Sequence, residues 1–382
     1  MVANNKNQHF VPKAYLRRFS CDPPDTERRR INGYLIDHDR FIDGISISDQ
    51  CSKNKFYGSD EIFEDFVQHF EGRYGIAIEA LEGNGQIYTG DISRFFLLQY
   101  LRTPHMLEQR RETIDHAQNL KIGGISRPEP INFVQSREMQ HQLYIAAAEN
   151  DILEDLEPVF IVNLTSVPFI TSDNPAVCTN RYNIQKLGDP TSGLASSGLV
   201  AAMPLNSHWL YLAYDRDVYK LKANDEILEL HNENDVHRLN EFQAIMATSC
   251  LYFADETGKS AVERAVQHGM EKRRNSWVEI WTGIADGVVN GMERYRKEQP
   301  GDEESREPRI VSVSPIMPKP HTWPSFLKLS ASPKGCDTRA MAGFFRQGSQ
   351  QAKDGKFPLI KLPKAQHRDA NPLTRKVAYL KE

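Results

Sequence analysis

The sequence predicts an α+β fold: helices packed on a mostly antiparallel sheet, an N-terminal hairpin and an extended C-terminal tail. Helical periodicity dominates residues 60–156, whereas the apolar residues of 159–214 follow the pattern of strands. The strands are grouped and do not alternate with helices, which is typical of α+β proteins rather than of parallel α/β sheets.

The first elements are a hairpin and two helices. Apolar and polar residues alternate within 31–57 on both sides of the turn Asp37-His38-Asp39, which predicts the hairpin. Apolar residues at helical spacing predict a helix over 60–81 and another that begins at the cap residue Asp91. Pro104 must kink or end this second helix, because proline lacks an amide hydrogen, and the helical pattern resumes over 106–120.

The remaining elements follow in order. A third helix is expected over 136–156. Strands are expected at 159–164, 169–170, 199–205, 209–214 and 277–284, and helices at 235–249 and 260–272.

Charge and composition divide the chain into an α+β core domain (1–293), a charged linker (294–308) and a basic, Pro-rich extension (309–382). The net charge is −4, but residues 301–382 hold 15 Lys and Arg against 8 Asp and Glu, which is +7. A basic tail on an acidic body can bind nucleic acid or an acidic protein partner. It can equally be a soluble extension.

Several classes of protein are disfavoured. No apolar run approaches the roughly 20 residues that span a bilayer, so no membrane partner is expected. The N-terminus has no apolar signal-peptide core, which predicts a cytoplasmic protein. The five cysteines are odd in number and lack C-x-x-C spacing, which disfavours a disulfide framework and a zinc ribbon. P-loop, Rossmann, zincin and serine-hydrolase motifs are absent.

The first candidate motif runs from His9 to Phe19. Pro12 suits the first turn of a helix, and Tyr15 then lies on an apolar face with Phe19 one turn later. Arg17 could bind a phosphate or carboxylate, and His9 could act as a general base or metal ligand. The alternative is that His9 only enters the helix and Arg17 is solvated.

The second candidate motif runs from Phe169 to Pro175. A strand ends in Asp173, and a carboxylate at a strand end is a common catalytic or metal-binding acid. Asp173 and Asn174 before a proline also make turns, which is the alternative. His208 opens a later strand and could approach Asp173 if the two strands pair. That strand lacks the acid-x-Lys triplet of restriction-type nucleases, which weakens a nuclease assignment.

Together the two motifs resemble a bacterial family, the domain of unknown function 4238. The resemblance rests on a His-x-Val-Pro-x-x-Tyr-Leu-x-x-Phe pattern beginning at His9, on the segment 169–175, and on similar positions at Arg102-Thr103-Pro104 and Leu239-Asn240, within residues 7–285. The family has no established activity. The resemblance implies only that its pattern residues are not incidental, namely His9, Tyr15, Arg102, Asp173 and Asn174.

Two hypotheses of function follow. The first is a hydrolase acting on nucleic acid or a nucleotide in bacterial or phage conflict, with a divalent metal as a possible cofactor. Its catalytic residues would be His9, Asp173 and Arg102, and its substrate-binding residues Tyr15, Arg17, Asn174 and His208. The second is a non-catalytic ligand- or protein-binding module whose basic tail contacts nucleic acid or an acidic partner.

Overall fold

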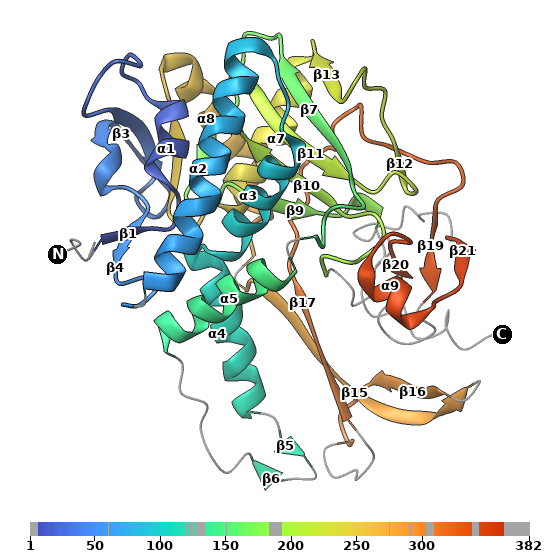
Figure 1. Ribbon diagram of the computed structural model, residues 1–382. Helices are drawn as coiled ribbons and strands as arrows, with labels where there is room; N and C mark the ends of the chain where they lie inside the picture. Colours follow the sequence, from blue (N-terminus) through green and yellow to red (C-terminus); the bar gives the residue numbers. More distant parts are fainter. Residues whose placement is uncertain are drawn as a thin grey trace.

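A five-stranded sheet forms the centre of the protein (Figure 1). The computed structural model describes residues 7–362 except 60, 120, 123–124, 127–133, 150, 183–192, 275, 290–291, 303–308 and 338–343. The strand order is β13 (Ile227–Leu230), β7 (Glu157–Asn163), β11 (Trp209–Tyr214), β10 (Val200–Pro204) and β9 (Val177–Thr179). Only the β13–β7 pair is parallel. The predicted α+β class, with a mostly antiparallel sheet, is confirmed.

Both faces of this sheet are buried, because successive side chains of a strand point to opposite faces. In β11, Tyr211 and Ala213 join one core cluster, whereas Leu210 and Leu212 join another on the opposite face. A strand buried on both faces needs apolar residues at every position. This explains the unbroken sequence Trp-Leu-Tyr-Leu-Ala-Tyr of β11.

Helices cover the two faces (Figure 1). The cluster of Tyr211 includes residues of α2 (Glu61–Asn84) and α3 (Thr89–Leu101), whereas the cluster of Leu210 includes residues of α7 (Glu233–Met246). Pro104 ends the helical run and begins α4, because its ring fits a first turn but not a helix interior. The other long helices are α4 (Pro104–Asn119), α5 (Gln135–Ala148) and α8 (Glu256–Gly269). The helix predicted over 136–156 thus ends at Ala148.

A second sheet carries the predicted hairpin. Its order is β3 (Arg40–Ser46), β2 (Arg30–Leu35), β14 (Cys250–Phe253) and β8 (Thr171–Ser172), with every neighbouring pair antiparallel. The chain turns between β2 and β3 at Asp39, which adopts the left-handed conformation that aspartate tolerates. The sequence missed β14, which joins the N-terminal hairpin to the second motif.

The N-terminal motif adds small elements of its own. Strand β1 (Asn7–His9) pairs with β4 (Ser52–Asn54), and helix α1 (Lys13–Leu16) continues into the 3-10 turn η1 (Arg17–Phe19). The remaining short elements are η2 (Ile36–His38), η3 (Ile47–Asp49), β5 (Lys121–Ile122), β6 (Ile125–Ser126) and η4 (Met270–Lys272).

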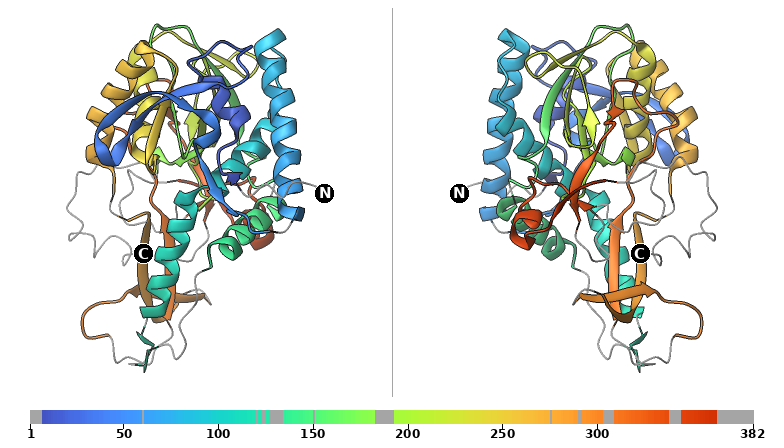
Figure 2. Two further views of the ribbon diagram at one scale, coloured as in Figure 1. Left: turned by 90° about the vertical axis from the view of Figure 1, so that its left-hand side faces the viewer. Right: turned by 90° about the vertical axis from the view of Figure 1, so that its right-hand side faces the viewer.

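A three-stranded sheet projects from the body beside α4 (Figures 1 and 2). It consists of β15 (Val278–Val289) between β16 (Met292–Lys297) and β17 (Arg309–Pro315). Residues 294–297, which the sequence placed in a charged linker, therefore form the end of β16. Residues 303–308 of that linker lie outside the described residues.

After β17 the chain returns over the body. Strand β18 (Lys328–Leu329) pairs with β12 (Tyr219–Lys220), and a small sheet follows in the order β20 (Phe344–Phe345), β19 (Lys334–Asp337), β21 (Leu359–Lys361), with α9 (Gln350–Gly355) between β20 and β21. Leu327 and Leu362 belong to the core cluster on the α7 face of the central sheet. Residues 316–337 and 344–362 thus lie against the body as an extended tail. The predicted division at 293 and 308 stays a prediction.

Candidate functional site

The first motif enters the body as a short helix. Pro12 precedes α1 in an extended conformation, and the helix presents the buried residues Tyr15, Leu16 and Phe19 to the interior. This face packs against aromatic rings of α2 and α3, with the Tyr15 ring 6.2 Å from that of Tyr74. The spacing of apolar residues in the motif therefore places these side chains in the hydrophobic core.

Tyr15 connects the first motif to the second. Its hydroxyl donates to the carbonyl oxygen of Pro204 at 2.6 Å and lies 2.8 Å from Thr171 Oγ1. Because Tyr15 has one hydrogen to donate, Thr171 is the donor in the second contact. Burial raises the pKa of Tyr15 well above its usual value, so the neutral phenol is the form present.

Asp173 binds the turn that follows α7. Its Oδ1 accepts from the amide of Thr248 and its Oδ2 from the amide of Ser249, both at 2.7 Å. The residue is 6% exposed. Burial raises the pKa of this carboxyl to about 6, although the backbone amides and the charge of Arg273 act in the opposite direction. Both oxygens are therefore occupied by the protein's own backbone.

The neighbours of Asp173 also bond to α7. Asn174 donates to the carbonyl of Met246 at 3.0 Å, and Ser172 donates to Gln243 at 2.7 Å. Asn240, one turn earlier, accepts from the amide of Ile170 at 3.1 Å. The side chains and amides of the second motif thus form hydrogen bonds with the C-terminal half of α7.

Arg102 is completely buried, at 0% exposure. Its Nη1 donates to Glu71 at 2.6 Å, while Nε and Nη2 donate to Gln99, which in turn donates to the carbonyl of Phe10. The next residue, Thr103, donates to Asn174 Oδ1 at 3.0 Å. The break between α3 and α4 therefore joins both motifs.

His9 differs from the other motif residues. It is half-buried, and its Nδ1 is buried without a hydrogen-bond partner in the described part of the chain. Burial lowers the pKa of His9, and the nearby charges of Lys13 and Arg102 lower it further. The lowered pKa favours the neutral imidazole, which is the form of histidine that can act as a general base.

A family model matches most of the chain. The model of a family described as "Protein of unknown function (DUF4238)" matches residues 7–257. The chain belongs to the DUF4238 family. Searches of curated proteins and of solved structures each found no match. The DUF4238 match contains both motifs, the α3–α4 break, α7 and β14, and it ends before the projecting sheet.

Two predicted site residues lie apart from the DUF4238 network. Arg17 is exposed. His208 is also exposed and lines a cavity of about 100 Å³ together with Ser166, Ser207 and Asp255. No hydrogen bond or ion pair joins His208 to Asp173 among the described residues. Contacts among their segments connect four of the seven predicted residues, namely Tyr15, Arg102, Asp173 and Asn174. His9 lies near enough to Arg102 for that charge to act on the imidazole.

Metal and membrane features are absent from the described ranges. Within residues 7–362, apart from the gaps given above, no group of three or more His, Cys, Asp or Glu could hold a metal ion. In the same ranges, no helix combines the length and the apolar composition that a membrane span needs.

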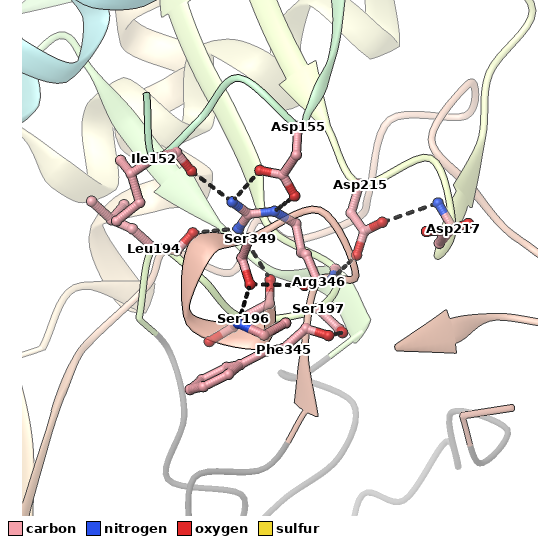
Figure 3. Close-up of polar contacts among 12 residues, drawn as sticks. Ile152, Asp155, Leu194, Ser196, Ser197, Asp215, Asp217, Phe345, Arg346 and Ser349 are labelled. Carbon is pink, nitrogen blue, oxygen red and sulfur yellow. Dashed lines mark hydrogen bonds and ion pairs between the residues drawn. The ribbon is translucent and has the colours of Figure 1, made fainter. Parts of the chain in front are cut away.

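The sequence missed a second buried polar cluster, which joins Arg346, beyond the DUF4238 match, to residues within the match (Figure 3). Arg346 is 2% exposed and pairs through Nε and Nη2 with both oxygens of Asp155, each at 2.8 Å. It also donates to the carbonyls of Ile152 and Leu194. The sequence around Arg346, Phe-Phe-Arg-Gln-Gly-Ser, has no periodic pattern that could have identified it.

Proposed function

We propose that the protein works by binding rather than by catalysis, as a module of the cytoplasm. The observation that carries this proposal is the bonding of Asp173, whose two oxygens accept from Thr248 and Ser249. An acid that acts on a substrate or metal ion must present an oxygen to it, whereas Asp173 is 6% exposed and directs both oxygens to backbone amides. The cytoplasmic assignment is supported by five free cysteines, which fit a reducing compartment.

The proposed binding element is the basic segment 363–382, and the proposed partner is nucleic acid. This segment holds five Lys and Arg against two Asp and Glu. It follows directly on Leu362, which is buried in the core and donates its amide to Pro333 at 2.8 Å. Lysine and arginine near phosphates release counterions, which favours binding at low salt.

Fluorescence anisotropy with a labelled DNA duplex tests this proposal. The full chain should bind more weakly as salt rises, and a chain ending at residue 362 should bind more weakly still, with a smaller salt slope. A variant with glutamine at Lys364, Arg368, Arg375, Lys376 and Lys381 is the matched control for charge. Equal DNA binding by the full chain, the chain ending at residue 362 and the glutamine variant contradicts the proposal. Binding of labelled polyglutamate without binding of the DNA duplex would instead identify an acidic protein partner.

A second candidate is the hydrolase acting on nucleic acid or a nucleotide in bacterial or phage conflict. One observation favours it, namely the neutral, half-buried His9 with its unpartnered Nδ1. In this proposal His9 is the general base, while Arg102 and Asp173 position the segments around it.

Hydrolysis assays on nucleotides and single- and double-stranded nucleic acids, with and without Mg²⁺ or Mn²⁺, test the second candidate. His9→Ala should abolish any hydrolysis while leaving the melting temperature within a few degrees. His208→Ala is the control, because this exposed histidine lies apart from the network. The absence of turnover by the wild-type protein on all substrates would exclude the hydrolase.

A further inference from the structure

Helix α2 presents one face to solvent along the outside of the body (Figures 1 and 2). Ile62 and Ile76 lie on this face and are 72% and 61% exposed. His69 lies midway between them and is also exposed. Because seven residues make about two helical turns, these three positions form one stripe. Ile62 and Ile76 are therefore the two ends of a stripe centred on His69, each about 10 Å from it along the helix axis.

Two glycines lie within the same helix. Gly72 and Gly75 are interior to α2, and a Cβ at either position would have no atom within 4 Å. Glycine lowers the stability of a helix interior, and packing within the described chain does not require it here. Gly72, three residues after His69, lies beside the stripe, and the absence of a side chain there would let another helix approach closely.

The residues of this face form a pattern that is complementary to itself. Two α2 helices can lie antiparallel, related by a two-fold axis at His69. Each residue of one copy then faces the residue of the second copy that lies equally far from His69 in the opposite direction along the sequence. Ile62 then faces Ile76 of the second copy, and Asp65 faces Arg73. Two-fold interfaces require this kind of self-complementarity. A random exposed face would not be expected to pair apolar with apolar residues and acid with base.

We infer that two copies of this chain associate through the outer face of α2, antiparallel and two-fold symmetric about His69. The half-buried Phe66 faces Gly72 of the second copy, where no side chain opposes its ring.

Arg73 is available for the second copy although it already has a partner. Its Nε and Nη2 donate to the two oxygens of Asp91 at 3.1 and 2.9 Å. Its side chain is 55% exposed, and an arginine has five N–H donors, so Nη1 remains for another carboxylate. Asp65 of the second copy completes this pairing.

Disulfide trapping of the full chain tests the two-fold axis directly. Cys21 is the exposed cysteine among the five, so Cys21→Ser provides a background without an accessible thiol. In this background His69→Cys should form a disulfide-linked dimer on mild oxidation, because a residue at the axis faces its own copy. Glu263→Cys, exposed on α8, should remain monomeric under the same conditions.

Sedimentation velocity at micromolar concentration provides the second measurement. The wild-type chain should sediment as a dimer and Ile76→Asp as a monomer. Leu164→Asp, at a residue 53% exposed elsewhere on the surface, should remain a dimer. A monomeric wild-type protein overturns the inference, and so does a dimer that survives Ile76→Asp or that His69→Cys fails to trap.

Discussion

The hydroxyl of Tyr15 lies 2.8 Å from Oγ1 of Thr171, although 156 residues separate them in the chain. This contact joins the two motifs that the sequence singled out. It also accounts for the residue types, because a buried tyrosine hydroxyl needs hydrogen-bond partners. Thr171 and the carbonyl of Pro204 supply them.

Replacing Tyr15 by phenylalanine should destabilise the protein by roughly 1–3 kcal/mol, since Thr171 and the Pro204 carbonyl would each lose a buried partner. Urea unfolding measures the change. Tyr144→Phe is the matched control, because Tyr144 is 67% exposed and should change little. An equal effect of both substitutions would show that the Tyr15 hydrogen bonds do not stabilise the fold.

Asp173→Asn should also lower the free energy of unfolding at pH 7, by roughly 1–3 kcal/mol. An asparagine can accept from one backbone amide, but its NH₂ group then faces the other amide donor of Thr248 or Ser249. Ser48→Ala, at an exposed residue of η3, is a suitable control. Full stability of the Asn variant would contradict a structural role for this carboxylate.

The pH dependence of the same variant gives a separate test. The folded pKa of Asp173 is about 6, above its ordinary 3.8, so the folded state binds this proton more tightly than the unfolded state. Binding of this proton therefore stabilises the folded state by about 3 kcal/mol below pH 4. This stabilisation is lost as the pH rises through 6. Asp173→Asn cannot titrate, so its deficit relative to wild type should grow as the pH falls from 7 to 4. A carboxyl pKa below 4 by NMR would contradict this.

Removing the Arg346 side chain should cost about 3–5 kcal/mol, because Arg346→Ala leaves the carboxylate of Asp155 poorly compensated in a largely buried site. Arg216→Ala is the control. Arg216 pairs with Glu157, but the two side chains are 71% and 42% exposed, so the change should be about 0–1 kcal/mol. If chemical denaturation showed the same loss of stability in both variants, the buried Arg346–Asp155 pair would contribute no more than the exposed Arg216–Glu157 pair.

Truncation should separate the wrapped part of the tail from the basic end. A chain ending at residue 308 loses Leu327 and Leu362 from the core, each worth about 2–5 kcal/mol, and should unfold or aggregate. A chain ending at 362 should keep the wild-type melting temperature in differential scanning calorimetry. If the chain ending at 308 were as stable as the chain ending at 362, residues 309–362 would not belong to the folded body.

Local patterns were sufficient for the long elements. Residues 209–214 were predicted as a strand and form β11, and the helix predicted over 60–81 is α2, because long stretches of regular periodicity bury one face or both. The helix predicted over 235–249 ends at Met246, since the following residues turn back to form β14. This strand has four residues and directly follows the helical pattern, so no local signal marked it.

The sequence by itself determined the α+β class, the main helices and strands, and the positions of the two motifs, because these depend on spacing between neighbouring residues. Only the tertiary structure decided what the motif residues do. Whether Asp173 faces a substrate or the amides of Thr248 and Ser249 depends on how α7 ends against β8. The position of Arg346 likewise depends on a partner 191 residues away. Contacts between distant segments leave no periodic trace in a single sequence.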